Sequence, residues 1–99
     1  MALRVRIAPT AAAQVRQAAA WWSEHRAKAP GAVRDDINEA LALLSHQPAL
    51  GSRCDDRGLE DVRRLLLGRL GYFLYYRVSG ETLDVLAFWH ARRQGLPRI

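Results

Sequence analysis

The segment from Val62 to Arg93 constrains the fold of this chain more than any other. It holds three short runs rich in β-branched, aromatic and aliphatic residues, separated by two short connections that contain Gly. These runs predict strands over about 62–67, 72–78 and 83–90. The connections 68–71 and 79–82 are short enough for hairpins. The segment therefore predicts a three-stranded antiparallel meander.

A strand is predicted near the N-terminus, before the meander. Residues 3–8 alternate with period two, so we expect Leu3, Val5 and Ile7 to face a core. Pro9 should end this strand, and Thr10 is suited to cap the helix that follows.

Two helices are predicted between that strand and the meander, over about 11–26 and 32–45, because apolar residues recur there at helical spacing. The first stripe consists of Ala11, Val15, Ala18 and Trp22, and the second of Val33, Ile37, Ala40, Leu41 and Leu44. Trp21 cannot share the direction of Trp22, so one of the two should sit at an edge. The short breaker at 28–31 predicts an antiparallel helix hairpin. Residues 47–61 are expected to be a loop.

The order of these elements predicts an α+β fold made of an N-terminal strand, a two-helix hairpin and the meander. We expect one domain over residues 1–99, because there is no repeat, linker or shift in composition. The single cysteine, Cys54, excludes an internal disulfide. No apolar run is long enough for a membrane helix, and the N-terminus lacks a signal-peptide pattern, so a cytoplasmic protein is expected.

The chain is basic, with a formal net charge of +5, and Lys28 is its only lysine. Arginine presents a planar fork that matches carboxylates and phosphates, so an anionic partner is favoured. His25, His46 and His90 have no metal-ligand spacing, and we expect neither a metal nor a cofactor.

The pairing of the meander strands predicts which side chains share a face. If Val78 opposes Leu83, then Leu74 opposes Ala87 and Tyr72 opposes Trp89. One face should then face a core and carry Leu65, Leu67, Leu74, Val78, Leu83, Val85 and Ala87, with Tyr72, Tyr76 and Trp89 at its rim. The other should carry Arg64, Phe73, Tyr75, Arg77, Asp84, Phe88 and His90. A slip of one residue would exchange the faces.

The second of these faces is expected to bind a partner, because exposed aromatic and cationic side chains mark interaction sites. Arg77 and Asp84 would be cross-strand neighbours that can pair. The alternative to partner binding is a hydrogen-bonding or packing role for His90. For Arg92 and Arg93 the alternative is a solvated basic tail.

The chain resembles the RelE/ParE superfamily of type II toxin–antitoxin toxins, and most of all its ParE branch. The resemblance is carried by Val62-Arg63-Arg64, the strand Gly71–Val78 and the segment Val85–Arg93, in that order. It implies a toxin silenced by an antitoxin whose C-terminal segment wraps it and whose N-terminal part binds operator DNA. ParE-like members poison DNA gyrase, whereas RelE-like members cut mRNA on the ribosome.

Two positions favour the gyrase branch over the nuclease branch. Where RelE-like enzymes have an arginine in the middle strand, this chain has Phe73, which cannot neutralise a phosphate. The tail 94–99 also lacks the tyrosine that such enzymes carry. Arg64, His90 and Arg93 form only a partial catalytic set for cutting RNA.

The leading hypothesis is therefore a ParE-like toxin that acts on gyrase by binding, without chemistry of its own. The alternatives are an mRNA endoribonuclease using Arg64, His90 and Arg93, and a non-toxic remnant that binds only an antitoxin. We expect an acidic antitoxin to cover the helix hairpin and the aromatic sheet face, with no membrane and no sequence-specific nucleic acid bound by the toxin alone. The expected contact residues are Arg64, Phe73, Tyr75, Arg77, Phe88, His90, Arg92 and Arg93.

Overall fold

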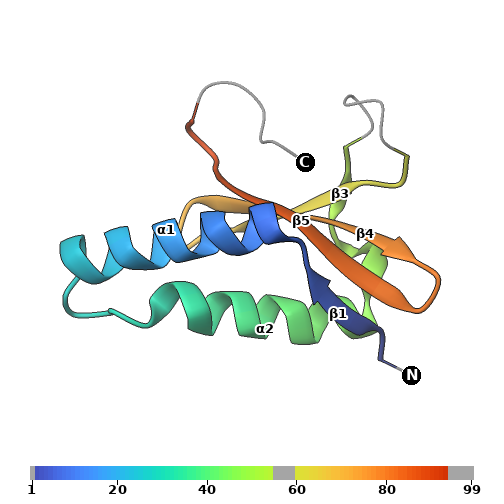
Figure 1. The fold of residues 1–99 in the computed structure, drawn as a ribbon, viewed down its shortest axis with the longest axis horizontal. Helices are drawn as coiled ribbons and strands as arrows, with labels where there is room; N and C mark the ends of the chain where they lie inside the picture. Colours follow the sequence, from blue (N-terminus) through green and yellow to red (C-terminus); the bar gives the residue numbers. More distant parts are fainter. Residues whose placement is uncertain (1, 55–59, 94–99) are drawn as a thin grey trace.

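The computed structural model describes residues 2–54 and 60–93, in which two helices pack on one face of a five-stranded sheet (Figure 1). The strand order is β1-β5-β4-β3-β2. The strands are β1 (Arg4–Ile7), β2 (Ser52–Arg53), β3 (Arg63–Leu67), β4 (Tyr72–Ser79) and β5 (Thr82–His90). The predicted meander is confirmed as β3, β4 and β5. The pairing of β1 with β5 is parallel, whereas the other pairings are antiparallel.

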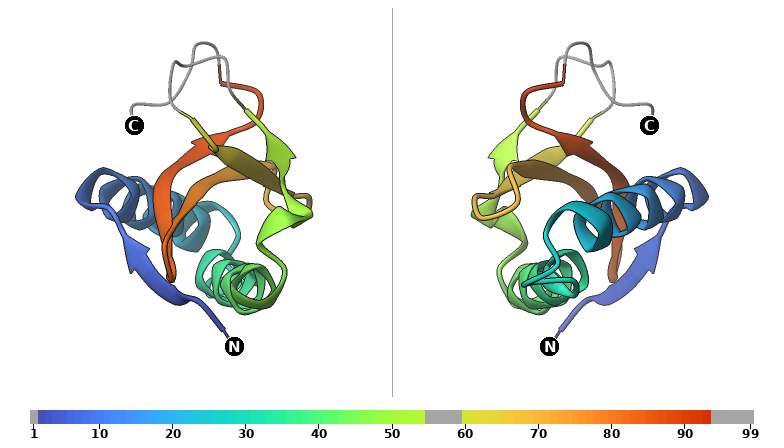
Figure 2. Two further views of the ribbon diagram at one scale, coloured as in Figure 1. Left: turned by 90° about the vertical axis from the view of Figure 1, so that its right-hand side faces the viewer. Right: turned by 90° about the vertical axis from the view of Figure 1, so that its left-hand side faces the viewer.

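The helix hairpin consists of α1 (Pro9–His25) and α2 (Ala32–His46). Figure 2, which views the molecule from two ends, places both helices on the same side of the meander. Helix α1 begins with Pro9 after Ala8, so the prediction that Thr10 caps it is wrong. Proline suits this position because its fixed φ is helical and the first helical N–H has no partner in any case. No helix in the described ranges is both long and apolar enough to span a membrane.

Both predicted helix stripes face the sheet and form its main core. The buried members are Ala11, Ala18, Val33, Ile37, Ala40 and Leu44, and Val15, Trp22 and Leu41 pack against them half-buried. The small side chains of α1 let this helix lie close to β5. As expected for one of the two neighbouring tryptophans, Trp21 sits at an edge, 44% exposed.

Strand β1 lies at the edge of the sheet, and its predicted core face does point to the helix side, where Val5 pairs with Leu83 and Ile7 with Val85, but it is covered incompletely. Val5 and Ile7 remain 41% and 43% exposed, and only Leu3 packs against the core. The cause is position: the helices pack over the central strands, so an edge strand is covered incompletely.

The register of the meander changes within the β4–β5 pair. Val78 opposes Leu83 and Tyr76 opposes Val85, as predicted, but the register shifts between Tyr75 and Tyr76. The extra residue on β5 is Leu86, which makes this a β-bulge.

The bulge exchanges the faces of the last four residues of β5. Leu74 opposes Phe88 instead of Ala87, and Tyr72 opposes His90 instead of Trp89. Phe88 is therefore buried in the main core under the helices, and the predicted placement of Phe88 and His90 on the opposite face is wrong. The predicted placement of Ala87 and Trp89 on the core face is also wrong. Both lie on the face without helices, here called the outer face.

The predicted loop 47–61 contains structure in its first half, a 3-10 turn at Pro48–Leu50 followed by β2. The hydroxyl of Tyr76 joins them to the sheet: it donates to the Pro48 carbonyl at 2.6 Å and accepts from the Gly51 N–H at 2.8 Å. Tyr76 is fully buried, so its predicted position at the rim of the core face is wrong. A Cβ on Gly51 would lie 2.5 Å from the Tyr76 hydroxyl, so only glycine fits there.

Candidate functional site

The outer face of the sheet carries two neighbouring aromatic rings, each with an arginine stacked on it. Phe73 on β4 pairs directly with Trp89 on β5. The Arg64 guanidinium carbon lies 4.2 Å from the centre of the Phe73 ring, and that of Arg93 lies 4.0 Å from the Trp89 ring. We call Arg64, Phe73, Trp89 and Arg93 the cation–aromatic ladder.

The ladder rests on a small second core. Val62, Tyr75 and Ala87 are buried there, and Phe73 and Trp89 pack against them half-buried. The Phe73 and Tyr75 rings meet edge to face with centroids 6.2 Å apart. This floor holds the two outer rings in place, which limits the side-chain entropy that a partner has to remove on binding.

Stacking on a ring orients a guanidinium without using its N–H donors. Neither Arg64 nor Arg93 donates a side-chain hydrogen bond or forms an ion pair within residues 2–54 and 60–93. Each exposed cation–π contact contributes about 0.5–1 kcal/mol. The ladder therefore presents two oriented donor groups to any acceptor placed over the outer face.

A second group of side chains lies at the end of the sheet, on the helix side. Tyr72 stacks on Phe88 with centroids 4.6 Å apart and meets the His90 ring edge to face at 5.0 Å. Burial raises the pKa of the Tyr72 hydroxyl, although the charge of Arg93 acts in the opposite direction. The His90 Nδ1 accepts a hydrogen bond from the Arg92 backbone N–H at 3.1 Å.

The acid on the outer face is already paired. Asp84 lies opposite Arg77, as predicted, but its carboxylate accepts a 2.7 Å hydrogen bond from the Nε of Arg6 on β1. The expected Arg77–Asp84 pair is thus replaced by a β1–β5 pair, because the parallel register places Arg6 beside Asp84. Arg77 consequently adds a further cation to the outer face.

The chain matches, over residues 5–95, the family model described as the ParE toxin of type II toxin–antitoxin system, parDE. It belongs to the ParE toxin family. A chain of the chromosomal ParDE system from P. aeruginosa has the same fold, with a TM-score of 0.73 at 23% identity, covering 91% of this chain and 97% of that one. No curated protein matches. The resemblance inferred from the sequence is confirmed, and this chain is a ParE-type toxin of a type II toxin–antitoxin system.

The ParE fold separates the predicted site residues of this chain into three groups. Arg64, Phe73 and Arg93 belong to the ladder, with Arg77 nearby on the same face. Tyr75 lies under the ladder, 3% exposed, and is unavailable for extensive contact with a partner. The remaining three residues are not on the outer face: Phe88 is buried, His90 lies on the helix side, and Arg92 is exposed in the turn after β5.

Sequence reasoning missed Trp89 as a member of the cation–aromatic ladder. The predicted strand over 83–90 assumes that side chains alternate between the two faces without a bulge. No Gly or Pro near Leu86 indicates that a bulge interrupts this alternation. The run Phe88-Trp89-His90 did indicate an aromatic site, but only the register decides which ring faces out.

The partial catalytic set is divided between the two faces of the sheet. Arg64 projects on the outer face, whereas His90 lies on the helix side beside Tyr72. Arg93 lies after the last strand, at the end of the sheet, where it reaches both sides: its guanidinium stacks on Trp89, and its side chain also lines a small cavity of about 130 Å³ with Tyr72 and His90. Within the described residues no three His, Cys, Asp or Glu side chains gather as a metal site. The tail 94–99, which lacks tyrosine, lies outside the described residues.

Proposed function

We propose that this ParE-type toxin inhibits DNA gyrase by binding to it, and that a cognate antitoxin neutralises the toxin. The observation that carries this proposal is the ladder, in which an apolar ring, Phe73, occupies the centre of the outer face. The rings of Phe73 and Trp89 offer flat apolar area, and Arg64 and Arg93 add oriented donors. Aromatic residues and arginine are the side chains most often found at the energetic centre of protein interfaces.

The division of the partial catalytic set supports binding over cleavage. Cutting RNA through its 2′-hydroxyl needs a base, an acid and a cation around one phosphate. Arg64 and His90 lie on opposite faces of a sheet, so they cannot reach the same phosphate without a rearrangement.

A second candidate function is ribosome-dependent mRNA cleavage, and one observation favours it. Arg93 lines the same cavity as the Tyr72 and His90 side chains, which brings a cation, a hydroxyl and an imidazole together. An enzyme of this kind would use His90 and Arg93 without Arg64. A non-toxic remnant that binds only the antitoxin is the third candidate.

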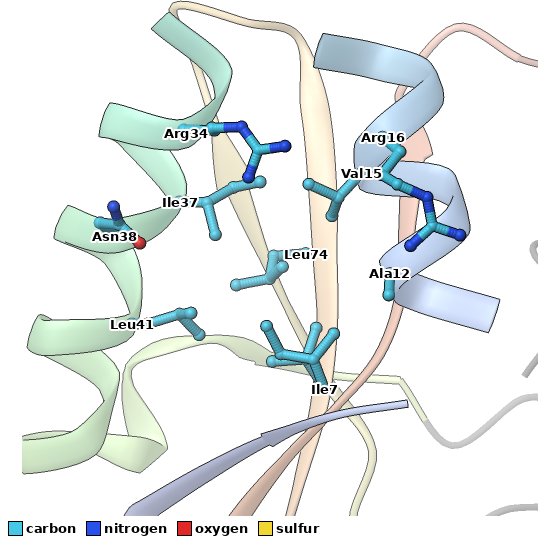
Figure 3. A pocket seen from close by; sticks show the side chains of 10 residues that line it. Ile7, Ala12, Val15, Arg16, Arg34, Ile37, Asn38, Leu41 and Leu74 are labelled. Carbon is cyan, nitrogen blue, oxygen red and sulfur yellow. The ribbon is translucent and has the colours of Figure 1, made fainter. Parts of the chain in front are cut away.

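The antitoxin is proposed to be acidic, with a separate DNA-binding part. The outer face and the helix hairpin are the proposed contact surfaces. The outer face carries the cations Arg64, Arg77 and Arg93, whereas residues 9–46 of the hairpin have four cations and four acids, and their contribution is the apolar groove beside Arg16 and Arg34 (Figure 3). Complementary charge speeds association and selects the partner.

A paired assay of the wild-type protein tests this function. We expect purified toxin to inhibit supercoiling by gyrase and to leave ribosome-bound mRNA intact. Cleavage of that mRNA, lost on His90→Ala, would instead establish the second candidate. Growth arrest on induction separates both from the remnant, which would cause none.

A further inference from the structure

A small cavity lies between helix α1 and the ends of strands β4 and β5, and it shares no lining residue with the apolar groove of Figure 3. Its volume is about 130 Å³. A cavity of about 150 Å³ holds a benzene ring, so this one has room for a group of nearly that size. The side chains with hydrogen-bonding groups that line it are Gln14, Gln17, Trp21, Tyr72, His90 and Arg93.

The backbone of β5 fixes the orientation of the Gln14 side-chain amide. Strand β1 pairs with β5 only as far as Val85, so the N–H of Phe88 lies beyond the paired region. The Gln14 Oε1 accepts a hydrogen bond from this N–H at 2.8 Å. Because only the oxygen of an amide side chain accepts, the NH2 group is the part of Gln14 that remains for another partner. Gln14 therefore offers N–H donors to a ligand.

A backbone contact likewise fixes which nitrogen of the His90 ring carries a proton. The Arg92 N–H donates to the His90 Nδ1 at 3.1 Å. A ring nitrogen that accepts a hydrogen bond holds no proton, so the proton of this ring lies on Nε2. The imidazole therefore also presents a donor to a ligand.

The charge and the remaining polar groups of the cavity favour an anion. Burial raises the pKa of the Tyr72 hydroxyl and the charge of Arg93 opposes the rise, so this charge acts within the cavity. The side chains of Gln17, Tyr72 and Arg93 form no hydrogen bond within residues 2–54 and 60–93. No aspartate or glutamate of those ranges lines the cavity. Donors around a cation, without an acid, select a negatively charged group.

We propose that this cavity binds the terminal phosphate of a nucleotide or of a nucleic acid strand. A phosphate group is slightly smaller than benzene, and it has three strong acceptor oxygens and a charge of about −1.5 to −2 at neutral pH. The Arg93 guanidinium offsets this charge, while the His90 Nε2–H and the Gln14 NH2 group donate to the oxygens. Binding needs no general base, so it depends neither on the proposed target nor on cleavage of RNA.

The size of the cavity and an aromatic ring beside it specify a terminal phosphate that carries a nucleoside. The cavity admits one phosphate group, whereas an internal phosphate needs an open path for the chain on both sides. Trp21 also lines the cavity and is 44% exposed. Its ring is held in place by parallel stacking on His25, with centroids 4.4 Å apart. The base attached to the bound phosphate can stack on an ordered, accessible ring of this kind.

NMR titration of the isotope-labelled toxin tests the ligand. The probes are inorganic phosphate, AMP and acetate, each at constant pH and ionic strength. We expect the indole N–H of Trp21 and the side-chain amides of Gln14 and Gln17 to shift to saturation with phosphate. AMP should bind at least about threefold more tightly than phosphate, and acetate at least about tenfold more weakly. The absence of a saturable shift at these signals would overturn the proposal. Acetate that binds as tightly as phosphate would also overturn it, because the cavity would then fit the carboxylate of a protein partner.

Two matched pairs of variants at exposed positions test the location. Gln17→Glu places a carboxylate at the cavity, and Ser23→Glu adds the same charge to α1 outside it. Arg93→Gln removes the cation of the cavity, and Arg92→Gln removes the same charge from the neighbouring position, which does not line it. We expect the first variant of each pair to weaken AMP binding by at least about tenfold and the second to leave it within about twofold. Equal effects within either pair would contradict the proposal.

Short oligonucleotides identify the source of the phosphate. A trinucleotide with a 5′-phosphate and the same trinucleotide with a 5′-hydroxyl are compared with AMP at the same NMR signals. Tighter binding of the phosphorylated trinucleotide than of AMP assigns the site to strand ends, whereas equal or weaker binding assigns it to free nucleotides. If the 5′-hydroxyl trinucleotide binds as tightly as the phosphorylated one, internal phosphates suffice and the proposal fails. None of these results depends on whether the toxin inhibits gyrase.

Discussion

The two faces of the sheet use the same strands for different purposes. The helix face of β4 and β5 contributes Leu74, Tyr76, Val85 and Phe88, which are at most 1% exposed. The outer face has half-buried Phe73 and Trp89 under two exposed or half-exposed arginines. The first arrangement stabilises the fold, whereas the second leaves rings and guanidinium groups where a partner can reach them.

The difference shows that a side chain of this protein can be held in one orientation without being buried. The ladder side chains are held in place by each other and by the small core of Val62, Tyr75 and Ala87, without being removed from solvent. An ordered but accessible ring needs little further immobilisation on binding. Substitutions on the two faces should therefore affect different measurements.

The largest effect on stability should come from the helix face. Leu74→Ala removes a fully buried side chain from the main core and leaves a cavity, at a cost of about 2–5 kcal/mol in unfolding free energy. Urea denaturation measures this loss. Leu66→Ala on the outer face, where Leu66 is 51% exposed, is the control and should change stability by under about 0.5 kcal/mol. Similar losses for the two variants would remove the contrast between the faces.

The next largest effect concerns the buried hydroxyl of Tyr76. Tyr76→Phe leaves the Gly51 N–H and the Pro48 carbonyl without this partner, which should cost about 1–3 kcal/mol. The same denaturation experiment measures it. Exchange of the Gly51 amide should also accelerate. A variant as stable as wild type would show that water replaces the hydroxyl at no cost.

A smaller effect is expected for the ring beneath Arg64. Phe73→Leu retains an apolar side chain but removes the cation–π contact, so unfolding free energy should fall by about 0.5–1 kcal/mol. Binding of the target should weaken more than stability, as titration of gyrase with the variant would reveal. A loss of stability as large as that of Leu74→Ala would place Phe73 in the core instead.

The smallest effect should appear in alkaline solution. Burial raises the pKa of both Tyr72 and Tyr76 in the folded chain, against the opposing influence of Arg93 in the first case and of the Gly51 N–H and Arg63 in the second. The unfolded chain therefore loses these protons first, at a pKa of about 10, and stability should fall as pH rises above that value.

Urea midpoints measured from pH 8 to above pH 10 test this pH dependence. Tyr76→Phe should flatten the decline relative to wild type. A decline of the same steepness in Tyr76→Phe would assign the effect to other groups.

Much of this fold follows from local patterns in the sequence. The helix stripes that include Ala11 and Val33, and the register from Val78 to Tyr76, agree with prediction because period and turn length determine them. The ladder was foreseen in part, through Arg64, Phe73 and Arg93. The other predictions failed where the structure depends on contacts between distant segments.

The bulge at Leu86 is the clearest of those cases. One unpaired residue reverses the faces of everything that follows it on β5, so Trp89 joins the ladder and Phe88 enters the core. Strand β2 has only two residues, too few for a periodic signal, and it is fixed through Gly51 and Tyr76. The exposure of Val5 and Ile7 likewise depends on how far the helices extend over the sheet.

The central claim is that the outer face acts on the target, and inhibition of gyrase supercoiling by two double variants tests it most directly. Arg64→Gln/Arg93→Gln removes both cations of the ladder, and Arg16→Gln/Arg34→Gln removes the same charge from the helix side. We predict that the first variant loses inhibition by about tenfold or more, while the second inhibits like wild type. Equal inhibition by both variants, or loss only in the second, would contradict the account.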